Sequence, residues 1–73
     1  MGTISIKIEV EKSKIAFVDN IFKAYEGLAM VTVIGGERGL INLEVPPSTK
    51  TDVLAILDDL ADKLELEIID IKD

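Results

Sequence analysis

Lys12, Ser13 and Lys14 are the residues whose types and spacing best suit a binding site, because they stand directly before a stretch with helical spacing. Free backbone N–H groups at a helix start, a hydroxyl and two ammonium groups together suit a carboxylate or a phosphate. Positive side chains at this end of a helix oppose the helix dipole, which makes the arrangement unusual. We therefore expect a candidate site for a small anionic metabolite here. The alternative is that the two lysines are solvated and balance Glu9 and Glu11.

Catalytic and metal-binding groups are scarce. The chain has no histidine and no cysteine, which removes the imidazole base, the thiolate nucleophile and the Cys/His zinc site. Asp58, Asp59 and Asp62 cluster on the polar side of a predicted helix, but a hard cation usually needs further oxygen ligands from a loop. We expect a solvated acidic face there, with weak cation binding or a basic protein partner as alternatives. We predict no enzymatic activity, no metal site and no cofactor.

The glycine-rich segment at residues 35–39 (Gly-Gly-Glu-Arg-Gly) could suggest a phosphate loop. It lacks the Gly-Lys-Ser/Thr ending of such a loop and joins two predicted strands, so it indicates a hairpin turn. Arg38, the only arginine of the chain, is a candidate anchor for a carboxylate of a partner.

Composition limits the class of protein. The chain has 73 residues, 48% of them apolar, and is predicted to fold as a single domain over residues 1–73. Its net charge is −6, with the acidic excess in residues 37–73, so nucleic acid is disfavoured as a partner. Its apolar runs are far shorter than the roughly 20 residues of a membrane span, and the N-terminus does not resemble a signal peptide. We expect a cytoplasmic protein without a membrane contact.

The first half of the chain is predicted to form a strand and a helix. Residues 3–10 alternate strictly, with β-branched side chains on one face, which indicates a half-buried strand. Residues 14–26 have apolar side chains at helical spacing, with Ser13 as the expected N-cap and Gly27 as the expected end. Phe22 and Tyr25 are expected in the core, with the Tyr25 hydroxyl reaching the surface or a partner.

The second half is predicted to form a hairpin, a helix and a strand. Residues 28–34 are uncharged on both faces, so their pattern does not show which face points inward. Residues 40–45 alternate, and the two prolines that follow end that strand. Thr49 and Asp52 have the spacing of a capping box before a second helix. Residues 66–71 form the last strand.

This βαββαβ order predicts the ferredoxin-like α+β sandwich, a four-stranded antiparallel sheet of order 4-1-3-2 with both helices on one face. The first and third strands are then central and the second and fourth are edges. The polar residues of the two central strands should line the open face: Ser5, Lys7, Glu9, Asn42 and Glu44.

The two expected edges differ in charge. The fourth strand carries charges that blunt an edge, whereas residues 28–34 have neither a charge nor a proline and should be covered. We predict a homodimer formed by sheet extension or by sheet stacking. The alternative is that a twist or the glycine-rich turn shields this strand. The interface candidates are Met30, Val31, Thr32, Ile34 and Arg38.

Two segments, Ala24-Tyr25-Glu26-Gly27-Leu28-Ala29 and Gly39-Leu40-Ile41-Asn42-Leu43-Glu44-Val45-Pro46-Pro47, resemble a family of small bacterial proteins of unknown function with a ferredoxin-like fold. The chain is also distantly similar to the ACT domains, βαββαβ modules that bind amino acids or other effectors at subunit interfaces. The loop of ACT domains that meets the ligand usually contains Asp or Asn and Gly, and residues 11–15 contain none of these.

The resemblance implies a non-catalytic, ACT-like regulatory or small-ligand-binding module that dimerises through its sheet. The alternative is a protein–protein interaction module that uses the uncharged edge of the second strand or the acidic face of the second helix.

Overall fold

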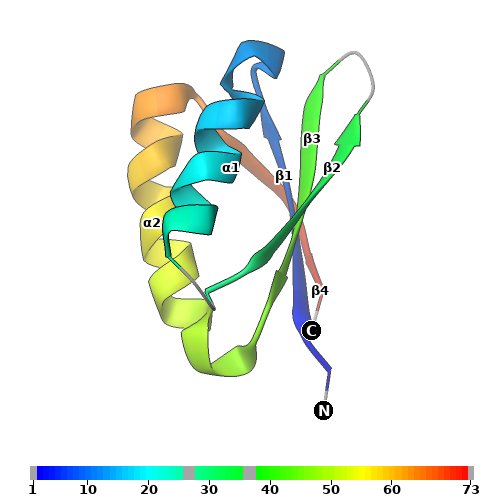
Figure 1. Cartoon of the computed structure of the whole chain (residues 1–73), viewed down its shortest axis with the longest axis vertical. Coiled ribbons are helices and arrows are strands. Elements are labelled where there is room, and N and C mark those ends of the chain that lie inside the picture. Colours follow the sequence, from blue (N-terminus) through cyan, green and yellow to red (C-terminus); the bar gives the residue numbers. More distant parts are fainter. Residues whose placement is uncertain (1, 26–27, 36–37, 73) are drawn as a thin grey trace.

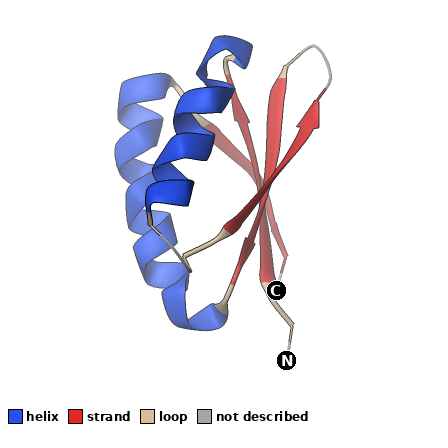
Figure 2. Ribbon diagram, in the orientation of Figure 1, coloured by secondary structure: helices blue, strands red, loops and turns tan. Residues whose placement is uncertain are grey.

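The computed structural model describes residues 2–25, 28–35 and 38–72. Its elements follow the predicted order (Figure 1): β1 (Ile4–Val10), α1 (Ile15–Ala24), β2 (Met30–Gly35), β3 (Gly39–Val45), α2 (Lys50–Leu64) and β4 (Glu67–Lys72). The strands form one antiparallel sheet of order β2-β3-β1-β4, which is 4-1-3-2 read from the other end. Both helices cover the same face of the sheet (Figure 2). The predicted ferredoxin-like fold is confirmed. Neither of these two helices is long and apolar enough to cross a membrane.

The core lies between this face and the two helices. Strict alternation in β1 and β3 buries every second side chain, and α1 and α2 add one apolar stripe each. Burial of a large apolar side chain stabilises a fold by about 1.5–3 kcal/mol, so this set carries most of the stability. Its members are Ile4, Ile6, Ile8, Val10, Val18, Phe22, Ile41, Leu43, Val45, Val53, Leu57, Leu60 and Leu66.

Both helices begin differently from the prediction. A single 3₁₀ turn precedes each of them, Lys12–Lys14 before α1 and Pro47–Thr49 before α2, and neither helix start has a side-chain cap. Ser13 is therefore not an N-cap. The Thr49 hydroxyl instead donates hydrogen bonds to the carbonyl oxygens of Leu28, at 2.8 Å, and Pro46, at 3.2 Å. The predicted end at Gly27 lies outside the described residues.

Tyr25 was expected in the core and is exposed, with 53% of its surface accessible. The helix α1 ends at Ala24, the residue before Tyr25. Tyr25 itself has φ −102° and ψ 79°, outside the helical region. The apolar stripe of α1 therefore does not continue to this residue. Phe22, one turn earlier, is buried as predicted.

The glycines at the two ends of the hairpin turn are required for different reasons. Gly35 has a positive φ of 93°, where a side chain is strained. Gly39 is buried, and a Cβ there would lie 2.6 Å from the carbonyl oxygen of Val10. Gly39 is thus required by the close approach of β3 to the end of β1. Gly36 and Glu37 lie outside the described residues.

Candidate functional site

The register of β2 shows which of its faces points inward. Val31 and Val33 pair with buried residues of β3 and share the helix side of the sheet. Met30 pairs with Glu44 and Thr32 pairs with Asn42, so both face the open side. In the described part of the chain, β2 is the end of the sheet and no strand pairs with its outer edge.

This outer edge is apolar and accessible. Met30 is 70% exposed and Ile34 is 49% exposed, while Val31 is half-buried against the core. The structure thus brings four of the five predicted interface residues together on one strand. We call this strand with its exposed side chains the β2 edge.

Arg38, the fifth predicted interface residue, is already paired. Its guanidinium donates a hydrogen bond to the Glu9 carboxylate of β1 on the open face of the sheet. The hydrogen bond and the charge of Glu9 raise the pKa of Arg38 above its ordinary value. A partner's carboxylate would have to compete with Glu9 for Arg38.

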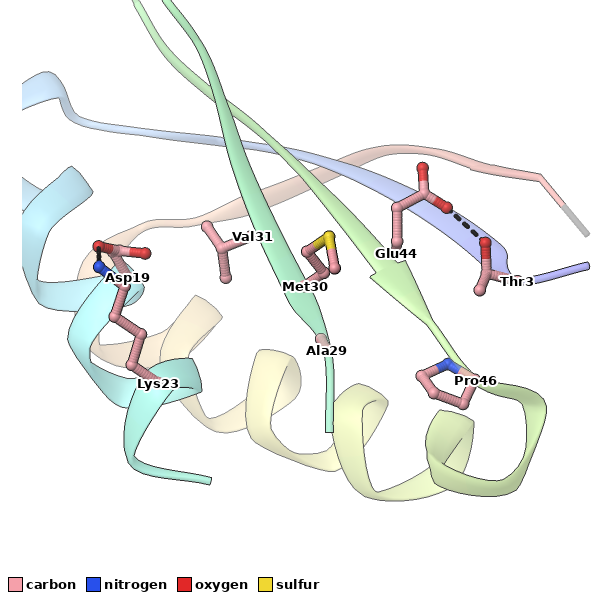
Figure 3. A pocket seen from close by; sticks show the side chains of 8 residues that line it. All are labelled: Thr3, Asp19, Lys23, Ala29, Met30, Val31, Glu44 and Pro46. Atoms are coloured by element: carbon pink, nitrogen blue, oxygen red, sulfur yellow. Dashed lines mark hydrogen bonds and ion pairs between the residues drawn. The ribbon is translucent and has the colours of Figure 1, made fainter. Parts of the chain in front are cut away.

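A hollow of about 530 Å³ crosses the start of the β2 edge. On the helix side, Lys23 and Asp19 of α1 form an ion pair at 2.9 Å, and on the other side lie Glu44 and Thr3 (Figure 3). The full lining is Thr3, Asp19, Lys23, Ala29, Met30, Val31, Glu44 and Pro46. The edge is therefore open from both faces of the sheet.

Glu44 is the centre of a hydrogen-bonded cluster on the open face. Its carboxylate accepts from the hydroxyls of Thr3, at 2.6 Å, and Ser5, at 2.9 Å, and from the Asn42 amide, at 2.8 Å. These bonds, that of Thr3 first, hold the pKa of Glu44 below its ordinary value. The alternation of β3 predicted the face on which Glu44 lies, but not this cluster, because its donors come from two strands and the N-terminal segment.

Lys12, Ser13 and Lys14 lie in the exposed 3₁₀ turn before α1. The nearest hollow, of about 400 Å³, contains Lys12 and Arg38 together with four carboxylates, those of Glu9, Glu11, Glu65 and Glu67. This excess of negative charge opposes an anion, whereas the N-terminus of α1, for which Lys14 is the N-cap residue, favours one. Anion binding at Lys12–Lys14 stays a prediction.

A family model whose description is "Domain of unknown function (DUF4911)" matches residues 8–64. The chain belongs to this DUF4911 family. This match confirms the predicted resemblance to a family of unknown function. Searches of curated proteins and of solved structures found no match. The matched range includes the β2 edge and both helices of this DUF4911 domain, whereas β4 begins beyond it.

The opposite edge, formed by β4, is less polar than its charges suggested. Ile68, Ile69 and Ile71 are each exposed by more than two fifths. The pairing of β4 with β1 shifts register between Ile68 and Asp70, which leaves Ile69 as an extra residue in the ladder. This second apolar surface was not predicted, because the charges of residues 67–72 indicated a polar edge, although the isoleucines of residues 68–71 were a signal for it.

The acidic residues of α2 are exposed as predicted. Asp58, Asp59 and Asp62 line one shallow surface, and Asp59 accepts a hydrogen bond from the Lys63 ammonium at 3.0 Å. Within residues 2–25, 28–35 and 38–72, no three acidic side chains are grouped closely enough to hold a metal ion.

Proposed function

We propose that this DUF4911 domain is a non-catalytic assembly module that forms a homodimer by antiparallel pairing of two β2 strands. The observation that carries the proposal is the β2 edge, an outer strand without charge whose apolar side chains are exposed. Such an edge presents unpaired backbone N–H and C=O groups to a second strand. Pairing would satisfy these groups and join two sheets into one.

Sheet extension is favoured over sheet stacking because the open face is polar. The Glu44 cluster and the Glu9–Arg38 pair occupy the two ends of this face. Stacking would take these charged groups out of water. The free energy of this desolvation exceeds the gain from their ion pairs and hydrogen bonds unless every polar group finds a partner. Extension at β2 leaves both groups solvated.

Charge also favours β2 over β4. Each copy has a net charge of −6, so two copies repel each other unless they meet at an uncharged surface. Residues 30–35 contain no charged side chain, and their ladder with β3 shifts register only near its end, at Ile34. In contrast, β4 carries Glu67, Asp70 and Lys72, and its ladder shifts register in the middle, at Ile69. The β2 edge is the surface that a second copy can approach with the smallest repulsion.

A two-fold axis at Thr32 gives this interface a simple register. It places the half-buried Val31 of one copy opposite Val33 of the second copy, and it brings the exposed Met30 close to the exposed Ile34, the residue at which the β2–β3 ladder shifts register. Such an isologous contact is self-complementary and closes at two copies.

Non-catalytic function is supported by the residue types and by Glu44. The chain has neither histidine nor cysteine. A carboxyl group that acts as a general acid near neutral pH needs a raised pKa, whereas the hydrogen bonds around Glu44 lower its pKa.

Sedimentation velocity on the tag-free chain and on two matched variants tests the dimer. The wild-type chain should sediment at twice its monomer mass of 8.0 kDa. Thr32→Lys places a charge in the middle of the β2 edge at an exposed position and should give the monomer. Ser48→Lys makes the same charge change at an exposed turn and should stay dimeric.

A third variant, Ile69→Lys, places the same charge on the β4 edge. It should leave the dimer intact. The proposal fails if the wild-type chain is monomeric at hundreds of micromolar, or if Ile69→Lys separates the copies and Thr32→Lys does not.

Binding of a small ligand is a second candidate function, favoured by the hollow beside β2. Its volume of about 530 Å³ lies in the range of small-molecule sites, and it combines the Lys23 ammonium and the Glu44 carboxylate with apolar side chains. The distant similarity to ACT domains makes an amino acid the first ligand to test.

A thermal-shift screen of the amino acids tests this function. A ligand present at 100 times its Kd stabilises the fold by about 2.7 kcal/mol. A shift that is lost in Lys23→Ala and kept in Lys14→Ala would favour the hollow beside β2. The reverse result would favour the turn at Lys12–Lys14, and no shift with any amino acid would count against ligand binding.

A further inference from the structure

The outer surface of the helix layer contains an apolar groove that the proposed dimer does not use. The helices α1 and α2 lie side by side (Figure 1), and a hollow of about 510 Å³ runs between them. Phe17 of α1 and Tyr25, the residue that follows α1, line it and are 51% and 53% exposed. The other apolar residues of its lining are Ile21, Ala24, Ala55, Ile56 and Leu60.

This groove follows from the spacing of residues along both helices. Phe17, Ile21 and Ala24 stand at positions i, i+4 and i+7 and so share one face of α1, next to the face that buries Val18 and Phe22. Ala24 and Ala55 contribute small side chains to its lining, between the larger residues. The groove thus consists of this second apolar face of α1 together with the side chains of α2 beside it. No described segment of the chain covers it.

A second hollow, of about 460 Å³, continues the groove toward the start of α2. It shares Tyr25, Ala55 and Ile56 with the first hollow and adds Leu28 and Asp52. From Asp52 to Lys63 the groove follows α2 for about three turns, or roughly 16 Å at 1.5 Å per residue. That length matches a helical segment of about eleven residues.

The α2 side of the groove is strongly acidic. Asp52 and Asp59 lie in its lining, and Asp58 and Asp62 follow on the adjoining exposed surface. Lys63 is the one basic residue in either hollow, and it donates its hydrogen bond to Asp59. On α1, Lys23 is paired with Asp19.

We propose that this groove binds an amphipathic helix of a different protein, with apolar side chains entering between α1 and α2 and basic side chains along α2. Helix-in-groove recognition uses apolar anchors at i, i+3, i+4 and i+7, and charge complementarity determines the orientation. A second copy of this acidic chain would bring like charges together along α2. The occupant is therefore a basic segment.

A synthetic peptide serves as the probe. It has 14 residues, leucines at positions i, i+3, i+4 and i+7, and lysines along one flank of the helix. Two control peptides have glutamate in place of each lysine, or the same composition in scrambled order. Fluorescence anisotropy measures binding to the full chain, and amide chemical shifts locate the contact.

The lysine peptide should bind saturably and at least tenfold more tightly than both control peptides, with shifts confined to α1 and α2. Phe17→Ser should weaken binding at least tenfold, whereas Ile69→Ser, at an equally exposed apolar position on β4, should not change it. The double variant Asp58→Asn/Asp62→Asn should weaken binding and reduce its salt dependence. Circular dichroism checks that each variant is folded.

Three results would overturn the proposal. The first is equal binding of the lysine and glutamate peptides, and the second is no saturable binding of the lysine peptide. The third is dissociation of a wild-type dimer by Phe17→Ser, because the groove would then be occupied by a second copy.

Discussion

The Thr49 hydroxyl donates a hydrogen bond of 2.8 Å to the carbonyl oxygen of Leu28, 21 residues earlier in the chain. This bond ties the turn before α2 to the segment that leads into β2. The spacing of Thr49 and Asp52 suggested a helix cap, but the hydroxyl satisfies a carbonyl of the opposite segment instead. Thr49 thereby helps to position the start of the β2 edge.

Thr49→Val removes this hydrogen bond and keeps the shape of the side chain. We expect the free energy of unfolding to fall by about 1 kcal/mol, because the half-buried Leu28 carbonyl loses its partner. Urea denaturation measures the loss. Thr51→Val, at an exposed position two residues further along, in the first turn of α2, should change stability by less than half as much. Equal losses would mean that the effect is one of helix propensity.

Gly39→Ala tests the contact between β3 and the end of β1. An added Cβ would lie 2.6 Å from the Val10 carbonyl oxygen. It would also lie 3.0 Å from Ile15 Cγ1 and 3.1 Å from Val10 Cγ2, which is tighter than most Cβ contacts. We expect a loss of about 1–3 kcal/mol by urea denaturation, as for other overpacked sites. Gly2→Ala, which meets nothing within 4 Å, is the matched control and should be neutral.

Glu65→Gly should stabilise the fold. Glu65 ends α2 in the left-handed region, with φ 55° and ψ 34°, a conformation that a side chain disfavours and glycine adopts freely. We expect a gain of up to about 1 kcal/mol, or roughly 4–8 °C in Tm for a chain of this size. Asp62→Gly, inside the same helix, should have the opposite sign, with a loss of about 1 kcal/mol. A loss in both variants would contradict the role assigned to Glu65.

Stability should fall in acid partly through Glu44. Its pKa is lowered in the folded state, so protons bind the unfolded chain more readily. The contribution of Glu44 is therefore complete above the ordinary glutamate pKa of about 4.3 and is lost as pH falls through the lower folded pKa.

Urea denaturation between pH 6 and pH 3 measures this contribution. The wild-type chain should lose more stability over that range than Glu44→Gln, which has no carboxylate to protonate at this position. Glu11→Gln, outside the cluster, shows whether any lost carboxylate has the same effect. Parallel curves for the wild type and Glu44→Gln would contradict the prediction.

The sequence predicted the fold because its strongest signals are periodic. Alternation at Ile4, Ile6 and Ile8 and helical spacing at Val53 and Leu57 each define one buried face, and those faces fit together in one topology. Less could be predicted where a residue's role depends on a distant segment. The bond from Thr49 to Leu28 is of this kind.

The candidate site was predicted in part for the same reason. The uncharged residues 28–34 identified the β2 edge, but their inward face became known only from the register with β3. The groove between α1 and α2 was not predicted, because helical spacing assigned Tyr25 to the core and gave Phe17 no role. Their exposure depends on where α1 ends and on how α2 lies beside it.

The extra residue Ile69 in β4 has a consequence for the size of any assembly. In the proposed dimer, the two β4 strands are the ends of an eight-stranded sheet. The bulge at Ile69 lies in the middle of β4, whereas the bulge of β2 lies near its end, at Ile34. Together with the charges of Glu67 and Asp70, the bulge at Ile69 interrupts the straight ladder that a further strand would need. Polymerisation into a fibril would then stop at both ends of the pair. The irregularity of β4 would therefore limit the assembly to two copies, although β2 is free to pair with another strand.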